Sequence, residues 1–69
     1  MELVNVNSSN LKSIGYENNT LVVKFNNGGI YWYSNVPQNI YEELLNAPSK
    51  GRYLNENIIN KYTHCKLNG

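Results

Sequence analysis

The chain has 69 residues, with six lysines and arginines against five glutamates and no aspartate, so its formal net charge is +1. This length predicts one domain and excludes a large two-lobed enzyme, because a chain this short buries only about 60% of the surface that it exposes when unfolded. A charge this close to zero is typical neither of a strongly basic nucleic-acid-binding protein nor of an acidic protein.

Three strands are predicted in the first half of the chain. Apolar and polar side chains alternate over residues 11–16 and 21–25, and residues 30–33 form an aromatic and β-branched run. Asparagine and glycine, which tolerate the positive φ of tight turns, separate these segments at 18–19 and 26–29. The pattern predicts an antiparallel meander.

The first turn determines which side chains share a face. A two-residue turn at 18–19 places one set of side chains together on the side predicted to face the core. These are Ile14, Tyr16, Leu21, Val23 and Phe25.

The second turn leaves two alternatives open. A two-residue turn at 27–28 puts Ile30 and Trp32 on the core side. A three-residue loop at 26–28, with Gly28 in the left-handed position of a bulge, instead puts Tyr31 and Tyr33 there. A shift of the strand register by one residue exchanges the side chains of the two faces.

Two helices are predicted in the second half of the chain. Pro37 opens the first helix, and its apolar side chains recur at three- and four-residue spacing until Pro48 ends the run. Ser49 is the predicted N-cap of the second helix. The apolar positions of that helix are Leu54, Ile58 and Tyr62. Residues 63–69 show no period.

The order of these elements predicts the fold class. Strands that precede both helices give an α+β domain, in which a three-stranded antiparallel meander is followed by two helices packed on one face. The other face of the sheet is then open.

Two sets of spaced motifs run through the chain. The first is Ser8-Ser9-Asn10-Leu11, Ile14-Gly15-Tyr16 and Leu21-x-Val23-x-Phe25-x-x-Gly28-x-x-Tyr31-x-Tyr33-x-x-Val36-Pro37. The second is Tyr41-x-x-Leu44-x-x-Ala47-x-Ser49-x-Gly51-x-Tyr53-x-Asn55-x-x-Ile58-x-x-x-Tyr62. Together they resemble the KTSC domain family from residue 8 to residue 62, which implies a single KTSC-like domain over residues 1–69.

The resemblance adds expectations that the residue pattern alone does not give. The KTSC domain occurs as a single-domain protein in bacteria and phages and is appended to the C-terminus of some lysyl-tRNA synthetases, a fusion that suggests RNA binding. Because the family keeps tyrosines on both sides of a free position, the resemblance selects the three-residue loop, with Tyr31 and Tyr33 toward the helices and Trp32 outward. It implies no catalytic or ligand-binding residue.

Residue types that catalysis and metal binding require are scarce. His64 and Cys65 are single and adjacent, and neighbours on an extended chain point in opposite directions. Glu42 and Glu43 diverge by about 100° on a helix and cannot flank one bond. We therefore expect no enzyme, no metal and no cofactor. One cysteine, no signal peptide and no long apolar run predict a cytoplasmic protein without a membrane partner.

The predicted open face carries the candidate binding residues. Its expected members are Leu11, Ser13, Gly15, Val22, Lys24, Ile30 and Trp32. An aromatic side chain beside a lysine can stack on a base, and cations of the basic last third can meet phosphates. The predicted nucleic-acid-binding residues are Trp32, Lys24, Lys50, Arg52 and Lys61. The alternatives are that Trp32 packs against residues 3–6 and that the cations only solubilise a helix.

These observations support three hypotheses about function. The first is a noncatalytic binding module for RNA or another single-stranded nucleic acid. The second is a protein-interaction module, such as a phage-encoded inhibitor or adaptor of a host protein. The third is a homo-oligomer that holds a small nucleotide between subunits, since a small core favours self-association.

Overall fold

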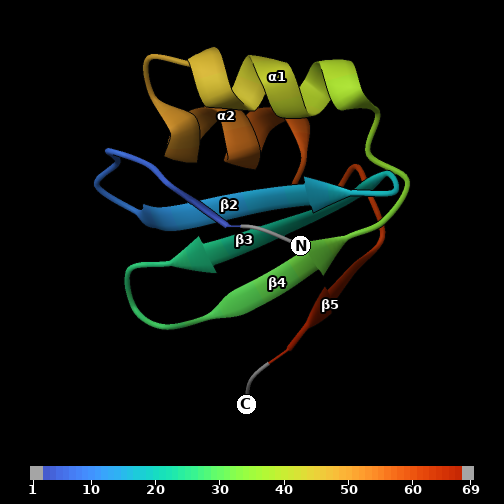
Figure 1. The fold of residues 1–69 in the computed structure, drawn as a ribbon, viewed down its shortest axis with the longest axis horizontal. Coiled ribbons are helices and arrows are strands. Elements are labelled where there is room, and N and C mark those ends of the chain that lie inside the picture. Colours follow the sequence, from blue (N-terminus) through green and yellow to red (C-terminus); the bar gives the residue numbers. More distant parts are fainter. Residues whose placement is uncertain (1–2, 68–69) are drawn as a thin grey trace.

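A meander of five strands, with two helices on one of its faces, makes up the protein (Figure 1). The computed structural model describes residues 3–67. The elements in chain order are β1 (Val4–Asn5), β2 (Leu11–Glu17), β3 (Thr20–Phe25), β4 (Ile30–Tyr33), α1 (Gln38–Asn46), α2 (Lys50–Asn57) and β5 (His64–Lys66). The strand order in the sheet follows the chain order, and all pairs are antiparallel. The predicted α+β class is confirmed.

Two short edge strands make the prediction of a three-stranded meander wrong in its strand count. β1 pairs with β2 at one edge and β5 pairs with β4 at the other. The Ser34 amide donates to the Thr63 carbonyl and the Leu67 amide to the Ile30 carbonyl, each at 2.8 Å, so the polar tail is held to the sheet. Strands of two and three residues are too short to show a two-residue period in the sequence.

The first hairpin has the predicted two-residue turn. Glu17 pairs with Thr20, and between them Asn18 and Asn19 have φ angles of 52° and 63°. Two successive residues in the left-handed region match the twist of the flanking strands, and asparagine adopts this region more readily than most side chains. The hairpin therefore depends on local sequence.

The second hairpin has the predicted three-residue loop. The Phe25 amide donates to the Gly29 carbonyl at 2.8 Å, which leaves residues 26–28 in the loop, and Gly28 has φ +95°. Both tyrosines of β4 consequently face the helices, where Tyr33 joins the buried core, and Trp32 faces the other way. This confirms the orientation that the family resemblance implied.

A bulge in β2 corrects one predicted face. Leu11 pairs with Phe25 but Ser13 already pairs with Lys24, so Lys12 is an extra residue in this strand. The extra residue turns the Leu11 side chain to the helix side, where it is 1% exposed. The expectation that Leu11 lies on the open face is therefore wrong.

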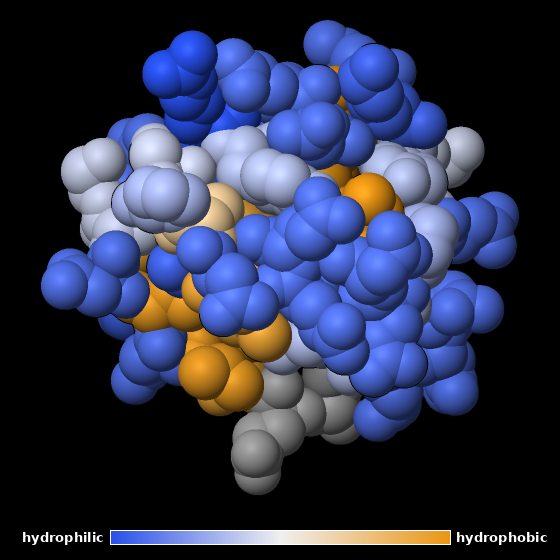
Figure 2. All heavy atoms as spheres, turned by 90° about the horizontal axis from the view of Figure 1, so that it is seen from above, coloured by the Kyte–Doolittle hydropathy of each residue, from blue (hydrophilic) through white to orange (hydrophobic). Residues whose placement is uncertain are grey.

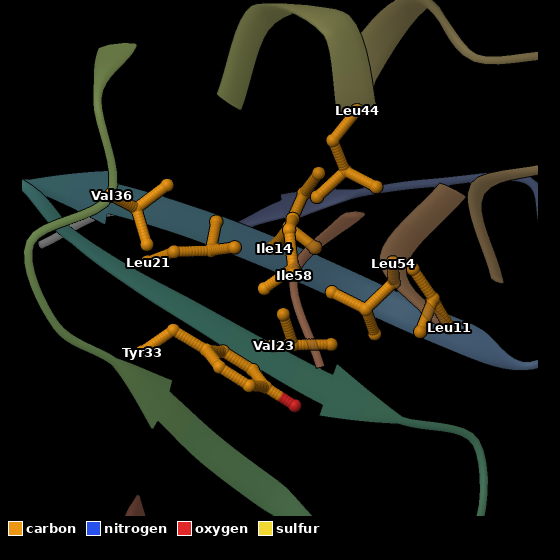
Figure 3. Packing of buried hydrophobic residues seen from close by; sticks show 9 residues of the cluster. All are labelled: Leu11, Ile14, Leu21, Val23, Tyr33, Val36, Leu44, Leu54 and Ile58. Atoms are coloured by element: carbon orange, nitrogen blue, oxygen red, sulfur yellow. The ribbon is translucent and has the colours of Figure 1, made fainter. Parts of the chain in front are cut away.

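The hydrophobic core lies between the sheet and the helices (Figure 3). Its buried members are Leu11, Ile14, Leu21, Val23, Tyr33, Val36, Leu44, Leu54 and Ile58. α2 ends at Asn57, so Tyr62 follows the helix, contrary to the predicted period, although its partly buried ring still packs on the core. The Asn10 side chain lies over Gly51 in the first turn of α2, where a Cβ would come within 2.8 Å of the Asn10 Nδ2 atom.

Neither helix has the length or the apolar character that a membrane span requires, as far as residues 3–67 are concerned.

Candidate functional site

The five predicted binding residues do not form one surface. Trp32 and Lys24 lie on the sheet face that the helices leave open. Lys50 and Arg52 belong to α2, on the opposite side of the sheet, and Lys61 follows α2 in the turn that leads to β5. A nucleic acid would have to wrap around the domain to touch all five.

Two of these cations already have partners. The Lys50 ammonium donates to the Ala47 carbonyl at 3.2 Å, at the junction of the two helices. The Arg52 guanidinium lies 3.1 Å from the Glu56 carboxylate on the next turn of α2. Both side chains of that pair are largely exposed, so the pair contributes at most a few tenths of a kcal/mol.

The sheet surface without helices, called the open face below, is largely apolar. Its members among the described residues are Leu3, Asn5, Ser13, Gly15, Glu17, Thr20, Val22, Lys24, Ile30, Trp32, Cys65 and Leu67. Of the four large hydrophobic side chains that are exposed within residues 3–67, three lie here: Leu3, Trp32 and Leu67, which are 42%, 44% and 49% exposed. The middle of this face is already covered within the chain, because Ser13 and Val22 are only 4% and 6% exposed and Gly15 is buried.

The N-terminal edge carries a second apolar patch. Val4 is 45% exposed, and the partly buried Val6 packs against the core. Figure 2, which looks onto the helices, shows hydrophobic atoms gathered at this edge and mostly hydrophilic atoms elsewhere on the helix side.

A hollow on the helix side, beyond the end of α2, gathers aromatic side chains. It has a volume of about 290 Å³. It is lined by Phe25, Asn27, Tyr31, Tyr33, Ile59 and His64, and is called the aromatic groove below. The strand register explains the gathering, because Tyr33 is paired with His64 and Tyr31 with Lys66 across β4 and β5.

The rings of the aromatic groove are packed around Tyr31. The Phe25 ring meets the Tyr31 ring edge to face, with centroids 5.5 Å apart and planes at 90°. The His64 ring is tilted against Tyr31 and Tyr33, at centroid distances of 6.2 Å and 5.9 Å. The Lys66 ammonium lies 5.9 Å from the Tyr31 ring centroid, within the range of a cation–π interaction. Tyr31 keeps part of its surface exposed.

A second hollow continues the aromatic groove along α2. It has a volume of about 410 Å³, and Phe25, Asn27 and Ile59 line both hollows. Its other lining residues are Ser9, Asn10, Asn26, Gly51, Leu54 and Asn55. The Asn26 amide group donates to the Ser9 carbonyl at 3.0 Å. The Asn10 and Asn55 side chains are exposed and make no hydrogen bond within residues 3–67, so their amides can meet a ligand.

Burial affects the ionisation of one groove residue. Desolvation raises the pKa of the Tyr33 phenol, and the nearby Tyr31 raises it further. The folded state therefore favours the neutral phenol, which adds to the free energy of unfolding. This stabilisation is complete below the pKa of the unfolded state, about 10, and is lost as pH rises through the higher pKa of the folded state.

This direction predicts alkaline destabilisation that depends on Tyr33. The urea midpoint of the wild type is expected to be lower at pH 11 than at pH 8, and Tyr33→Phe is expected to reduce that difference because it removes the ionising group. Tyr53→Phe is a suitable comparison, since the pKa of Tyr53 is also raised, but its partly buried ring packs on the outside of the core and its hydroxyl donates to Glu43. An unchanged pH dependence in Tyr33→Phe would contradict the assignment.

No sequence pattern pointed directly to the aromatic groove. His64 and Lys66 lie in the tail that has no period, and only the pairing of β5 with β4 brings them to the tyrosines. The Tyr-x-Tyr spacing was the available signal, since it predicted two rings on one face. The register also places His64 and Cys65 on opposite faces of β5, as expected for neighbours on a strand. Within residues 3–67 no cluster of potential metal ligands occurs.

Comparison with known proteins supplies a family for this geometry. The model of the KTSC domain matches residues 7–62. The crystal structure of a KTSC domain protein from Yersinia pestis superimposes with a TM-score of 0.93 at 33% identity, covering 97% of each chain. An uncharacterized protein of Stutzerimonas stutzeri is 41% identical over 58 residues, which cover 81% of this chain and 82% of that protein.

A larger relative carries a similar segment. The lysine–tRNA ligase of Nostoc punctiforme is 39% identical over 67 residues, which are 94% of this chain. The chain corresponds to 12% of the length of that ligase. The similarity therefore concerns a small part of the enzyme.

Proposed function

Because the chain belongs to the KTSC domain family, we propose that it is a small noncatalytic binding module and that its ligand is a single-stranded nucleic acid, with RNA as the first candidate. The bound segment lies in the aromatic groove, with one base on the Tyr31 ring. This proposal places the contact on the helix side of the sheet, opposite the predicted Trp32.

One observation carries the proposal: a partly exposed tyrosine ring is held edge to face by Phe25 and has the Lys66 ammonium over it, 5.9 Å from the ring centroid. A fixed aromatic face binds any base by stacking, at about 1–3 kcal/mol per base. The neighbouring ammonium can contact the phosphate of the same nucleotide. The open face offers an exposed ring as well, but Lys24 on that face is paired with Ile30, and Trp32 is paired with Val22.

The second hollow gives the module room for a neighbouring nucleotide. The amides of Asn10 and Asn55 can donate to and accept from a base edge or a ribose hydroxyl, because an amide offers both functions. Neutral amides contribute orientation and leave phosphate binding to Lys66 and to the predicted cations Lys50, Arg52 and Lys61. A modest, salt-sensitive affinity is the expected result.

The relatives support this class of ligand indirectly. The name of the Nostoc punctiforme relative, lysine–tRNA ligase, describes an enzyme that acts on tRNA. Its matching segment aligns with 94% of this chain. A domain shared between a tRNA ligase and a small separate protein is consistent with a common role in RNA binding.

The test is a binding titration with fluorescein-labelled, mixed-sequence single-stranded RNA at 50 mM salt. Tyr31→Leu is expected to weaken binding about ten-fold or more, because it removes the stacking face. Trp32→Leu is the matched control, since it changes the adjacent residue of β4 on the opposite face and should leave the affinity within two-fold. Circular dichroism of both variants is the control that they are folded.

The possible results separate the two predicted surfaces. Loss of binding in Trp32→Leu and Lys24→Glu, with Tyr31→Leu unaffected, would place the ligand on the open face and contradict the groove. Absence of any complex with RNA and single-stranded DNA at low salt would contradict the nucleic-acid function itself.

Salt dependence tests the role of the Lys66 ammonium. Affinity is expected to fall steeply between 50 and 200 mM salt, and Lys66→Gln should reduce the slope of log K against log salt by about 0.7, the share of one phosphate contact on a single strand. Lys12→Gln, which changes an exposed lysine in the β2 bulge, should leave the slope unchanged. Equal slopes in wild type and Lys66→Gln would exclude a phosphate contact there.

A protein-interaction module is the second candidate function, because the open face exposes Leu3, Trp32 and Leu67 together. An apolar protein interface barely responds to salt, so binding of a partner protein that persists unchanged to 200 mM salt would favour it.

A further inference from the structure

The second hollow has the composition of a nucleobase pocket, and we propose that it reads one base of the bound strand and prefers a base with an amino group beside a ring-nitrogen acceptor, that is, adenine or cytosine. The inference rests on the proposed function, since the base in question neighbours the one stacked on Tyr31. Phe25, Asn27 and Ile59 line both hollows, so two successive nucleotides of one strand can occupy them. Binding is then selective for sequence at one position.

Three segments that are far apart in the sequence form the second hollow: the connection from β1 to β2, the loop from β3 to β4, and helix α2 (Figure 1). The partly buried Phe25 and Ile59 give it an apolar surface on which the flat face of a base can lie. None of the described residues that line it is charged, and four of them are asparagines. A neutral base therefore suits this hollow better than a phosphate does.

Hydrogen bonds of the β3–β4 loop decide which amide atoms remain for a ligand. The Asn26 Nδ2 atom donates to the Ser9 carbonyl at 3.0 Å and to the Ser8 carbonyl at 3.4 Å. The Asn26 Oδ1 atom has no partner within residues 3–67, so it remains as an acceptor. The Asn27 Oδ1 atom accepts from the Gly29 amide at 2.9 Å, which leaves the Asn27 Nδ2 atom as a donor between the two hollows.

A fixed acceptor favours a base edge that carries a donor. Adenine and cytosine each have an amino group beside a ring nitrogen that accepts, whereas uracil and hypoxanthine have a carbonyl oxygen in place of the amino group. That oxygen would face the Asn26 Oδ1 atom with no proton between them. The Asn55 amide completes the recognition, because it is exposed, has no hydrogen bond within residues 3–67, and can both donate to and accept from one base edge.

The test compares bases that differ in this one group. Fluorescein-labelled uridine heptamers, with adenine or hypoxanthine at the central position, are titrated with the full chain at 50 mM salt. The adenine heptamer is expected to bind about five-fold more tightly or better, and a central cytosine should bind more tightly than the all-uracil heptamer. Equal affinities for adenine and hypoxanthine would overturn the inference and leave the proposed function intact. Absence of binding by every heptamer would contradict the proposed function itself.

Two variants locate the preference in the second hollow. Asn55→Ala and Asn26→Ala should each reduce the ratio of adenine to hypoxanthine affinity, while the affinity for the all-uracil heptamer stays within about two-fold. Asn57→Ala is the matched control on α2, because Asn57 lies outside the lining and donates to the Tyr53 carbonyl. A ratio that survives in both Asn55→Ala and Asn26→Ala, or that falls equally in Asn57→Ala, would overturn the assignment.

Nuclear magnetic resonance of the ¹⁵N-labelled chain shows where the base lies, independently of affinity. The side-chain amide signals of Asn10 and Asn55 are expected to shift during titration with the adenine heptamer. The corresponding signals of Asn39 on α1 and of Asn57 should stay unchanged. Shifts of the Trp32 indole signal without shifts of Asn10 and Asn55 would place the base on the open face and overturn the inference.

Discussion

Replacing Leu44 by alanine is expected to remove about 2–5 kcal/mol from the free energy of unfolding, because it leaves a cavity under α1. Leu44 is the fully buried residue of this helix, and Figure 3 shows its side chain pointing from α1 into the core. At about 0.05–0.15 kcal/mol per residue, the whole domain has only about 3–10 kcal/mol of stability. The variant should therefore be largely unfolded or close to its unfolding transition.

The matched control is the neighbouring Leu45→Ala. Leu45 is only partly buried, so the same truncation removes less apolar area and should cost less than half as much. Alanine is the best helix former, so neither change carries a propensity penalty. Urea denaturation, followed by far-ultraviolet circular dichroism, measures both free energies. Equal losses in the two variants would show that Leu44 does not anchor α1.

The hairpins were predictable because their geometry is local. Two adjacent asparagines with positive φ fix a two-residue turn, and the parity of that turn determines the faces of β2 and β3. The second turn was not determined by the residues alone, since glycine and asparagine at 26–29 allow two loop lengths. The tyrosine spacing of the family selected the three-residue loop.

The bulge and the edge strands depend on tertiary structure. Nothing in Leu11 or Lys12 distinguishes a regular strand from one with an extra residue, and the difference appears only when Leu11 is seen in the core. β1 and β5 contain two and three residues and exist because β2 and β4 offer unpaired backbone groups. Both edge strands also lie outside the segment that matches the family model, residues 7–62.

The candidate site was predictable only in its chemistry. Exposed aromatic rings beside cations were expected, and Lys66 lies over Tyr31 on the helix side, whereas Trp32 and Lys24 share the open face without being paired. Which pair forms a hollow depends on how far α2 extends over the sheet, since the helices cover the core but leave Tyr31 partly exposed. The apolar spacing also predicted too long a second helix, because Tyr62 continues the four-residue spacing although α2 ends at Asn57.

Replacing Tyr16 by alanine is expected to cost about 3 kcal/mol, the second large effect, because this residue connects the first hairpin to α1. Its ring stacks on Tyr41 of α1, with centroids 4.8 Å apart and planes at 11°. Its hydroxyl donates to the Val36 carbonyl, and the Val36 amide donates to the Asn19 carbonyl at 2.8 Å. The turn of the hairpin and the start of α1 are thus tied together at one point.

Tyr16→Phe separates the two contributions. It keeps the ring and removes the hydroxyl, so it should cost about 1 kcal/mol, the net value of one hydrogen bond. A double-mutant cycle of Tyr16→Ala and Tyr41→Ala should then give a coupling of about 0.5–1.5 kcal/mol from the stacked rings. Urea midpoints of the three variants and the wild type supply the four free energies. If the coupling is zero while both single variants are destabilised, the rings act through separate packing, and α1 is held to the hairpin by Val36 instead.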